Sequence, residues 1–166
     1  MNYETIDTPI GPITLVGDGN ALSMVGLPES RRPLAIQANW KREPSSFVEA
    51  KRQFAAYFAG ELIEFDLPLA PRGTTFQLGV WKALCTIPYA ATISYAELAR
   101  RIGNPKASRA VGLANGANPL SIIVPCHRVI GANGSLTGYG GGLKAKQILL
   151  ELERRHAPRQ AFTLAS

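Results

Sequence analysis

The chain lacks any long hydrophobic run. No stretch of about 18 consecutive apolar residues occurs among its 166 residues, so the sequence offers no candidate for a membrane-spanning helix. Glu4 and Asp7 lie where a secretory signal peptide would carry basic residues and an apolar core. We therefore expect a cytoplasmic protein.

Residues that bind metals or form disulfides are also scarce. The sequence has 2 cysteines and 2 histidines, and none of them shows a CxxC or HxxxH spacing, so we expect no metal site. Without an export signal, Cys85 and Cys126 are expected to be free thiols. Cys85 fits the apolar side of a helix and is predicted to be buried, whereas the polar neighbours of Cys126 suggest reactivity.

Charge is unevenly distributed along the chain. Residues 1–72 contain 7 Lys or Arg against 9 Asp or Glu, whereas residues 73–166 contain 11 against 3, so the two parts carry −2 and +8. An excess of this kind favours a polyanionic partner, with nucleic acid first and an acidic membrane surface second. A solubilising surplus of positive charge is the alternative.

Residues 1–72 have the pattern of a small α/β domain. Turn residues separate short apolar runs over residues 1–27 and predict a β meander. Helical spacing of apolar residues over 47–58 predicts a helix. Residues 65–69 are predicted to form an edge strand, because Pro68 cannot donate a hydrogen bond to a ladder. We find no chemistry in this part.

Residues 73–166 are predicted to be mainly helical. Three caps mark helix starts: Thr74 with Gln77, Ser94 with Glu97, and Asn104 followed by Pro105. The second and third of these short helices are joined by a turn that contains Gly103, which is typical of a helix-turn-helix. A closing amphipathic helix is predicted over 143–153, with a peripheral tail from Ala157.

The third helix is unusually rich in small residues and is expected to end near Asn115 and Gly116. Its small residues are Ala107, Ser108, Ala110, Gly112 and Ala114. One long side chain, Arg109, lies among them. A helix that reads the major groove needs several long polar side chains, so this composition favours close approach to a minor groove. Tight packing against the core is the alternative.

A thiol, an imidazole and a guanidinium follow one another in PCHRV, residues 125–129. The neighbours of Cys126 are groups that help to form or stabilise a thiolate. The glycine-rich residues 131–142 follow directly, in the place of a wing, and their backbone can approach a ligand closely.

This motif, preceded by ANGANP at 114–119 and followed by GYGGG at 138–142, resembles the active-site signature of the O6-alkylguanine-DNA alkyltransferases, also called methylated-DNA protein-cysteine methyltransferases. The resemblance covers residues 73–155 and is closest to the stand-alone form of the family. It implies an α/β (α+β) domain over 1–72, with a small antiparallel sheet and a helix. It also implies a winged helix-turn-helix-like domain over 73–166 that binds DNA and transfers the alkyl group.

The resemblance implies direct-reversal repair without a cofactor or metal. Cys126 would take the alkyl group from O6-alkylguanine irreversibly, so each molecule would act once. His127 would deprotonate the thiol through a water, Glu153 would orient the imidazole, and Tyr95 would donate to a ring nitrogen of the base. This arrangement follows the logic of a catalytic triad. Repair of O4-alkylthymine stays open.

Other positions match the family's DNA and base contacts. Arg109 would fill the space left by the extruded nucleotide, with Lys106 and the small face Ser108, Ala110, Gly112 and Ala114 on the DNA. Asn118 would brace the turn before the cysteine. The alkylguanine pocket would contain Val129, Tyr139, Gly140 and Ser121. Ser121 replaces a proline of several relatives, which favours a pocket that is not restricted to methyl.

The expected partner is double-stranded DNA that contains O6-alkylguanine, bound by a monomer, with clustering on DNA open and no membrane involved. Two alternatives come from other classes. One is a DNA-binding module without chemistry, but the alkyltransferase-like proteins that flag damage lack the cysteine. The other is a Cys-His hydrolase, which needs an oxyanion hole and turns over many times.

Overall fold

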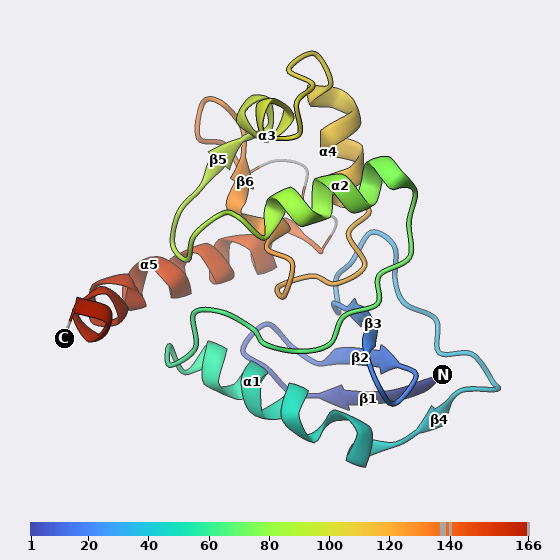
Figure 1. Cartoon of the computed structure of the whole chain (residues 1–166). Coiled ribbons are helices and arrows are strands. Elements are labelled where there is room, and N and C mark those ends of the chain that lie inside the picture. The colour runs from blue at the N-terminus through green and yellow to red at the C-terminus, as the bar shows by residue number, and fades with distance from the viewer. Residues whose placement is uncertain (137–138, 140, 166) are drawn as a thin grey trace.

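A computed structural model describes residues 1–136, 139 and 141–165, with residues 158–165 described by their backbone alone. The sheet and α1 form one side of the molecule, and the helices α2 to α5 form the other (Figure 1). This arrangement confirms the expected fold class, a small α/β part followed by a helical DNA-binding part.

The N-terminal part contains the predicted meander. Strands β1 (Asn2–Ile6), β2 (Ile13–Gly17) and β3 (Leu22–Gly26) pair antiparallel, and the sheet order is β3-β2-β1-β4. The short β4 (Lys41–Arg42) pairs parallel with β1, so the sheet is mixed rather than wholly antiparallel. A 3-10 turn, η1 (Pro44–Phe47), leads into α1 (Val48–Phe58), which confirms the predicted helix.

The predicted edge strand at residues 65–69 is wrong. Only Leu69 forms an isolated bridge, with Leu22 of β3. The Gln53 side chain instead pairs with the backbone of Asp66, donating to its carbonyl at 2.9 Å and accepting from its N–H at 2.8 Å. Because a side chain satisfies this backbone, the segment crosses from α1 to α2 without a ladder of its own.

The C-terminal part is helical, and its elements are α2 (Thr75–Leu84), β5 (Ile93–Ser94), α3 (Tyr95–Arg101), α4 (Ser108–Gly116), η2 (Cys126–Arg128), β6 (Val129–Ile130) and α5 (Leu143–Ala165). Thr74 and Gln77 form the predicted capping box of α2 in both directions. Ser94 caps α3 by accepting from the Glu97 N–H at 3.1 Å. The Glu97 carboxylate forms ion pairs with Arg100 and Arg101 of the same helix, rather than the reciprocal bond of a capping box.

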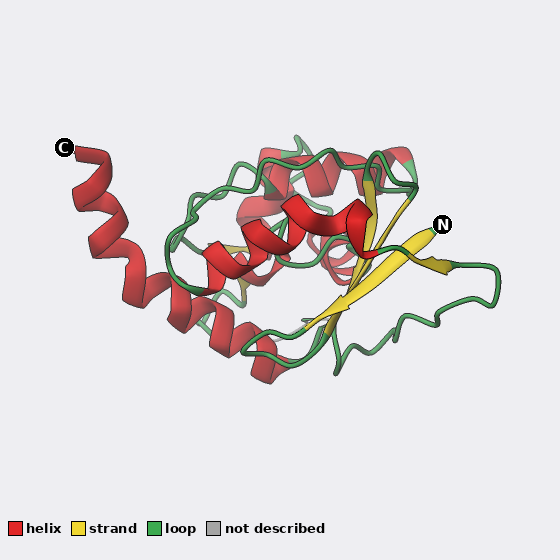
Figure 2. Cartoon of the chain, turned by 90° about the horizontal axis from the view of Figure 1, so that it is seen from below, coloured by secondary structure: helices red, strands yellow, loops and turns green. Residues whose placement is uncertain are grey.

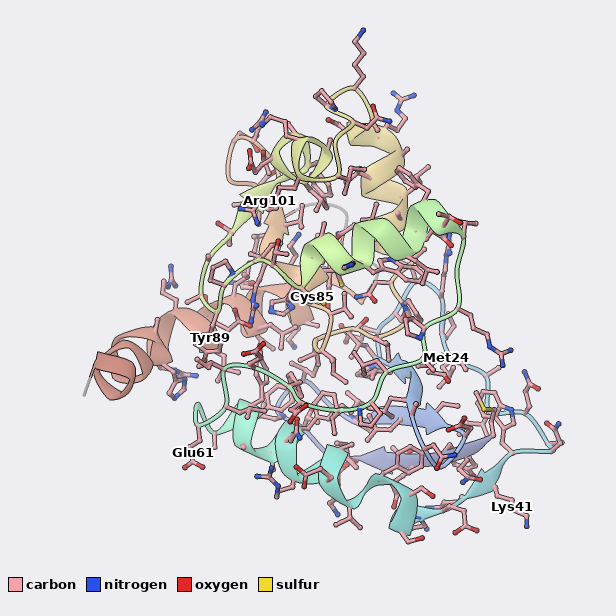
Figure 3. All side chains as sticks on the ribbon, viewed as in Figure 1. Met24, Lys41, Glu61, Cys85, Tyr89 and Arg101 are labelled. Atoms are coloured by element: carbon pink, nitrogen blue, oxygen red, sulfur yellow. The ribbon has the colours of Figure 1, made fainter. Side chains whose placement is uncertain are left out.

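Three expectations for this part are corrected. The third helix begins at Ser108 rather than at Pro105, because Ala107 N–H bonds to the Asn104 carbonyl at 3.0 Å and closes a separate turn. Cys85 is exposed rather than buried, because it lies at the C-cap of α2 (Figure 3). The peripheral tail is helical, and α5 extends away from the body of the molecule (Figure 2).

The wing was expected over residues 131–142, and three of these, 137, 138 and 140, lie outside the described residues. Within the described part, β5 and β6 form a parallel pair, in which Ile93 faces Val129 and Ser94 faces Ile130. This pair joins the start of α3 to the segment that carries Cys126. The helix-turn-helix and the cysteine motif are therefore connected directly.

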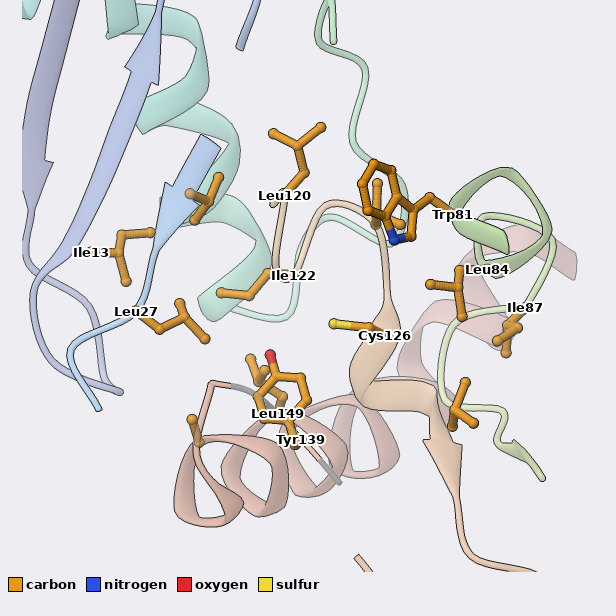
Figure 4. Packing of buried hydrophobic residues seen from close by; sticks show 14 of the residues in the cluster. Ile13, Leu27, Trp81, Leu84, Ile87, Leu120, Ile122, Cys126, Tyr139 and Leu149 are labelled. Atoms are coloured by element: carbon orange, nitrogen blue, oxygen red, sulfur yellow. The ribbon is translucent and has the colours of Figure 1, made fainter. Parts of the chain in front are cut away.

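One hydrophobic core runs through both parts of the chain. Leu120 and Ile122 lie between Ile13 of β2 and Leu27, which follows β3, on one side and Trp81 and Cys126 on the other (Figure 4). The Val25 N–H of β3 also donates to the Pro119 carbonyl at 2.8 Å. The cysteine segment is thus held against the N-terminal sheet as well as against the helices.

Candidate active site

Asn118 bridges the turn before the cysteine with two hydrogen bonds. Its Oδ1 accepts from the Leu120 N–H at 3.0 Å, and its Nδ2 donates to the Val124 carbonyl at 2.9 Å. Between these two residues, Ile122 has a φ of 77°. A β-branched residue in the left-handed region stores about 1–3 kcal/mol of strain, which the surrounding structure must hold. The Asn118 bridge supplies part of that support.

Cys126 lies at the first position of η2 and is only 3% exposed. Its sulfur points away from η2 toward the side occupied by Ile122, Leu27 and Tyr139 (Figure 4). Burial raises the pKa of the thiol, while the Asn118 side chain and the Lys146 charge act in the opposite direction. The thiol is therefore protonated at neutral pH, and its use as a nucleophile needs a base.

A cavity of about 130 Å³ borders Cys126 and is lined by both parts of the chain. Leu27 and Arg32 come from the N-terminal part, and Asn115 and Ser121 from the C-terminal part. Asn115 is 1% exposed, and its Nδ2 donates to the Cys126 carbonyl at 3.4 Å. The cavity brings polar groups close to the thiol.

His127 and Glu153 form a fully buried pair, with 2.6 Å between Nε2 and Oε2. Burial lowers the pKa of His127 despite the opposing effect of Glu153, so the imidazole is neutral at neutral pH. An ionised carboxylate has no proton to give, so Nε2 must carry the hydrogen that this bond requires. The lone pair therefore lies on Nδ1, which has no hydrogen-bond partner among the described residues.

The Glu153 carboxylate accepts hydrogen bonds from several residues in addition to His127. Burial alone would raise the pKa of its carboxyl, but His127 and Arg128 outweigh burial and hold that pKa well below its usual range. Arg128 donates to both carboxylate oxygens, at 2.8 and 3.1 Å. The Ala90 N–H donates at 3.1 Å and the Tyr57 hydroxyl at 2.6 Å. Three residues besides His127 therefore hold the carboxylate in place.

Lys146 is the second buried cation of the site. It is 0% exposed, its Nζ donates to the Val129 carbonyl, and it lies 5.9 Å from the centre of the Tyr139 ring. Burial lowers the pKa of its ammonium to about 8, and the charge of Cys126 acts against that shift. At neutral pH a positive charge therefore lies close to the thiol.

Tyr95 occupies the first position of α3 and is half-buried. Burial, together with the charge of Cys126, raises the pKa of its phenol, so the hydroxyl keeps its proton. A methyl group at Gly112 would lie 3.7 Å from the Tyr95 ring, which shows how closely α4 approaches this side chain. Tyr95 therefore lies close to α4 and within electrostatic reach of Cys126.

The small-residue face of α4 is only partly exposed. Lys106, Arg109 and Ala110 are exposed, and Ser108 and Gly112 are half-buried. Ala114 instead faces the core at 3% exposure, and its carbonyl accepts from the Trp81 indole N–H at 2.8 Å. Sequence reasoning missed Leu113, which is 70% exposed on this helix. The outer face combines a cation with a bare apolar side chain.

The remaining pocket residues are buried. Val129, Tyr139 and Ser121 are 0%, 1% and 9% exposed, and Gly140 lies outside the described residues. Sequence reasoning also missed Tyr57, Lys146 and Asn115 as parts of the site. Lys146 precedes Glu153 by seven residues on the predicted helix, and this spacing places both on one face. That signal could have found it.

Two searches concern the described residues alone. They contain no cluster of His, Cys, Asp or Glu that could hold a metal ion. None of their helices is both long and apolar enough to cross a membrane.

Comparison with known proteins gives a consistent assignment. Residues 75–155 match the family model described as 6-O-methylguanine DNA methyltransferase, DNA binding domain, and residues 1–71 match its ribonuclease-like domain. The methylated-DNA–protein-cysteine methyltransferase of Mycobacterium tuberculosis is 57% identical over 158 residues, 95% of either chain. That of Methanosarcina acetivorans is 56% identical over 153 residues, 92% of this chain and 98% of that protein.

Solved structures agree. The crystal structure of Mycobacterium tuberculosis OGT in complex with DNA has a TM-score of 0.88 at 56% identity and covers 94% of both chains. That of the Mycobacterium tuberculosis O6-methylguanine methyltransferase has a TM-score of 0.83 at 56% identity, with 93% of both chains covered. The chain therefore belongs to the 6-O-methylguanine DNA methyltransferase family.

Proposed function

We propose that this protein repairs DNA by moving the alkyl group of O6-alkylguanine onto Cys126 in a single, irreversible step. The observation that carries the proposal is a buried thiol followed in the sequence by a buried imidazole, which has its lone pair on Nδ1 and bonds to a carboxylate that Tyr57 and Arg128 also hold. Membership of the family and the exposed cation on α4 support DNA as the substrate.

The proton of the thiol goes to His127. The neutral imidazole offers the Nδ1 lone pair, and a bridging water connects it with Cys126 in this proposal. Glu153 holds the opposite nitrogen and stabilises the imidazolium that forms. Lys146 adds a positive charge near the new thiolate. Each unit by which these groups depress the pKa of the thiol gives nearly tenfold more thiolate until ionisation is complete.

The thiolate then displaces guanine at the alkyl carbon. A bond forms between Sγ and that carbon, the bond between carbon and O6 breaks, and its electron pair stays on the base. Tyr95 donates to a ring nitrogen and offsets this charge, because its phenol remains protonated. The products are a thioether on Cys126 and unmodified guanine. The thioether does not readily give up its alkyl group, because the Cys126 thiolate is a poor leaving group from carbon, so each molecule acts once.

The target base reaches the cysteine only after it leaves the stack. Arg109 on the exposed face of α4 enters the duplex and fills the space of the extruded nucleotide. Extrusion costs a few kcal/mol, and the cost is smaller for a poorly paired base such as an alkylated guanine. Lys106 contacts phosphate, which adds affinity without sequence preference. We also propose a cytoplasmic location, with association with the nucleoid when the protein is bound to DNA.

The extruded base binds against Val129, Tyr139 and Gly140, with Asn118 keeping the cysteine turn in place. The cavity beside Cys126 includes Ser121 and measures about 130 Å³. Ser121, at the position of a proline in several relatives, is smaller than that proline and borders this space. We therefore propose that alkyl groups larger than methyl are accepted.

Intact mass spectrometry tests the proposal. The protein is incubated with excess duplex oligonucleotide that contains one O6-methylguanine, and both products are analysed. The expected result is one methyl group per protein chain, located on Cys126, with guanine restored in an equal amount of DNA. Unmodified protein that still binds the duplex would support a damage reader, and restoration of many guanines per chain would support a turning-over enzyme. Either result would overturn the proposal.

A further inference from the structure

Tyr57 of α1 is the one residue of the N-terminal part that contacts the catalytic carboxylate among the described residues. Its side chain is 1% exposed, and its hydroxyl donates to Glu153 Oε2 at 2.6 Å. The two residues are separated by 96 positions in the sequence. The same oxygen accepts the bond from His127 at 2.6 Å. The N-terminal part thus touches the atom that orients the base.

Tyr57 limits a rotation of the Glu153 carboxylate that its other hydrogen-bond partners restrain less. Glu153 Oε1 is held by Arg128 Nε at 2.8 Å and by the Ala90 N–H at 3.1 Å. Oε2 receives Tyr57, His127 and a longer bond of 3.1 Å from Arg128. Without the hydroxyl, rotation of the carboxylate about its bond to the side chain is resisted at Oε2 only by that longer bond and by the histidine itself.

We propose that Tyr57 is a positioning residue for alkyl transfer, whose hydroxyl holds Glu153 Oε2 in line with His127. This inference rests on the proposed function for its effect on rate, but not for its effect on the imidazole. It assigns the N-terminal part a role in the chemistry, in addition to its role in the shared core. Tyr57 acts through Glu153 and touches neither the thiol nor the base.

The surroundings of Tyr57 are built to keep its ring fixed. Phe65 packs on it with 5.4 Å between ring centres, and Tyr89 meets it edge-on at 6.4 Å. Tyr89 in turn lies 5.7 Å from the Arg128 guanidinium. At the end of α1, Gly60 has a φ of 77°, and a Cβ there would lie 2.1 Å from the His156 ring of α5. This contact joins α1 to α5 one turn beyond Glu153.

The protonation states suit this role. Burial and the Glu153 charge raise the pKa of the Tyr57 phenol well above its usual value, so Tyr57 remains a neutral donor. Tyr57 and His127 bond to the same oxygen, Oε2. The His127 bond remains when the Tyr57 donor is removed, so the greater negative charge on Oε2 favours the imidazolium and raises the pKa of His127, while the less restrained carboxylate slows the transfer. The other ionisable groups that face Glu153 or His127 are Arg128, Lys146, Tyr139, Tyr89 and Cys126.

The test compares Tyr57→Phe with a packing control, Phe65→Leu, which disturbs the same aromatic cluster and leaves the hydroxyl in place. The reaction rate with free O6-benzylguanine is measured between about pH 5 and about pH 8, so DNA binding plays no part. For Tyr57→Phe we expect a plateau roughly tenfold lower, since a hydrogen bond to a charged group is lost. The rate falls at low pH as His127 becomes protonated, and we expect the midpoint of this fall to move to higher pH. Phe65→Leu should lower the thermal midpoint and leave the pH midpoint unchanged.

Two NMR measurements stand apart from the reaction. The chain has only 2 histidines, so the His127 titration is followed with His156 as the reference. It should move to higher pH in Tyr57→Phe. In the wild type, the Tyr57 hydroxyl proton should be protected from exchange and show a nuclear Overhauser contact with the His127 ring, a result that needs no variant.

An unchanged rate, pH midpoint and His127 titration in folded Tyr57→Phe would overturn the inference, as would equal pH shifts in Phe65→Leu. A missing hydroxyl contact in the wild type would do the same. If the wild type gains no alkyl group while the His127 titration still moves, the proposed function fails and the positioning role stands.

Discussion

The charged side chains at the outer face of α4 are exposed and unpaired within the described residues, whereas those around Glu153 are buried and paired. Lys106, in the turn before α4, and Arg109, on α4, are exposed and form no ion pair within the described residues. Around Glu153, every charge lies within hydrogen-bond distance of an opposite charge or a carbonyl. Exposed charge is free to meet phosphate and is screened by salt, whereas buried charge is held in one arrangement. DNA binding and alkyl transfer should therefore fail separately.

The largest expected effect is at the nucleophile. Cys126→Ser should abolish alkyl transfer and leave duplex binding intact, because no DNA-facing group changes. Cys85→Ser, which alters the exposed thiol, should retain full stoichiometry. Mass spectrometry and a gel-shift titration measure the two properties. Methyl transfer to Cys126→Ser would show that another residue accepts the group.

The next effect concerns the buried carboxylate. Glu153→Gln should slow transfer at least about a hundredfold, because Nε2 loses its ionised acceptor. It should also lower the free energy of unfolding by about 3–5 kcal/mol, since Arg128 is left buried without its partner. The exposed neighbour supplies the control, Glu151→Gln.

The sign of the pH effect follows from the lowered pKa of Glu153. The contribution of the ionised Glu153 carboxylate to folding stability is complete above the ordinary pKa of 4.5. It is lost as the pH falls through the lower pKa that this carboxyl has in the folded protein. Urea unfolding should therefore separate Glu153→Gln from the wild type most clearly above pH 4.5. Equal unfolding curves there would contradict the buried network.

A smaller change is expected from acidification of the wild type. Burial lowers the pKa of His127 below its ordinary 6.5, and only the neutral imidazole accepts the thiol proton. The transfer rate should therefore hold down to pH 6.5 and fall below it, while the His127 contribution to stability is lost over the same interval. Single-turnover rates and urea unfolding measure both, and His156→Gln should leave the acid limb in place. A transfer rate that already falls above pH 6.5 would rule out a neutral His127.

The smallest expected effect is on the exposed face. Lys106→Gln should weaken duplex binding about equally for damaged and undamaged DNA and reduce the salt slope of the affinity by about 1. Transfer to free O6-benzylguanine should not change. Lys51→Gln, on α1, is the control. A loss confined to damaged DNA would assign Lys106 to base recognition instead.

The sequence predicted what local patterns encode. Thr74 with Gln77 marked the start of α2, and the PCHRV motif led to Cys126 and His127. Pro105 misplaced the start of α4, because Asn104 closes a turn where a helix cap was expected. Pro68 likewise suggested an edge strand, although the Gln53 side chain satisfies the backbone of Asp66 within that segment. In both cases a local signal was outweighed by a hydrogen bond that the signal does not contain.

The carboxylate network was beyond local patterns. The resemblance indicated Glu153, but no sequence signal links it to Tyr57, 96 residues earlier. Tyr57 lies within the helix that the apolar spacing of residues 47–58 predicted, and a buried hydroxyl needs a partner. Which partner it finds depends on how α1 meets α5, and only the folded structure gives that.

The central claim is that α4 presents the base and the buried network takes its alkyl group. The most direct test is the rate of transfer from duplex O6-methylguanine and from free O6-benzylguanine, measured side by side for Arg109→Ala and Glu153→Gln, with Arg52→Ala on α1 as the control. We predict that Arg109→Ala slows only the duplex reaction and that Glu153→Gln slows both by the same factor. Equal losses on both substrates for Arg109→Ala, or a loss on duplex alone for Glu153→Gln, would contradict the account.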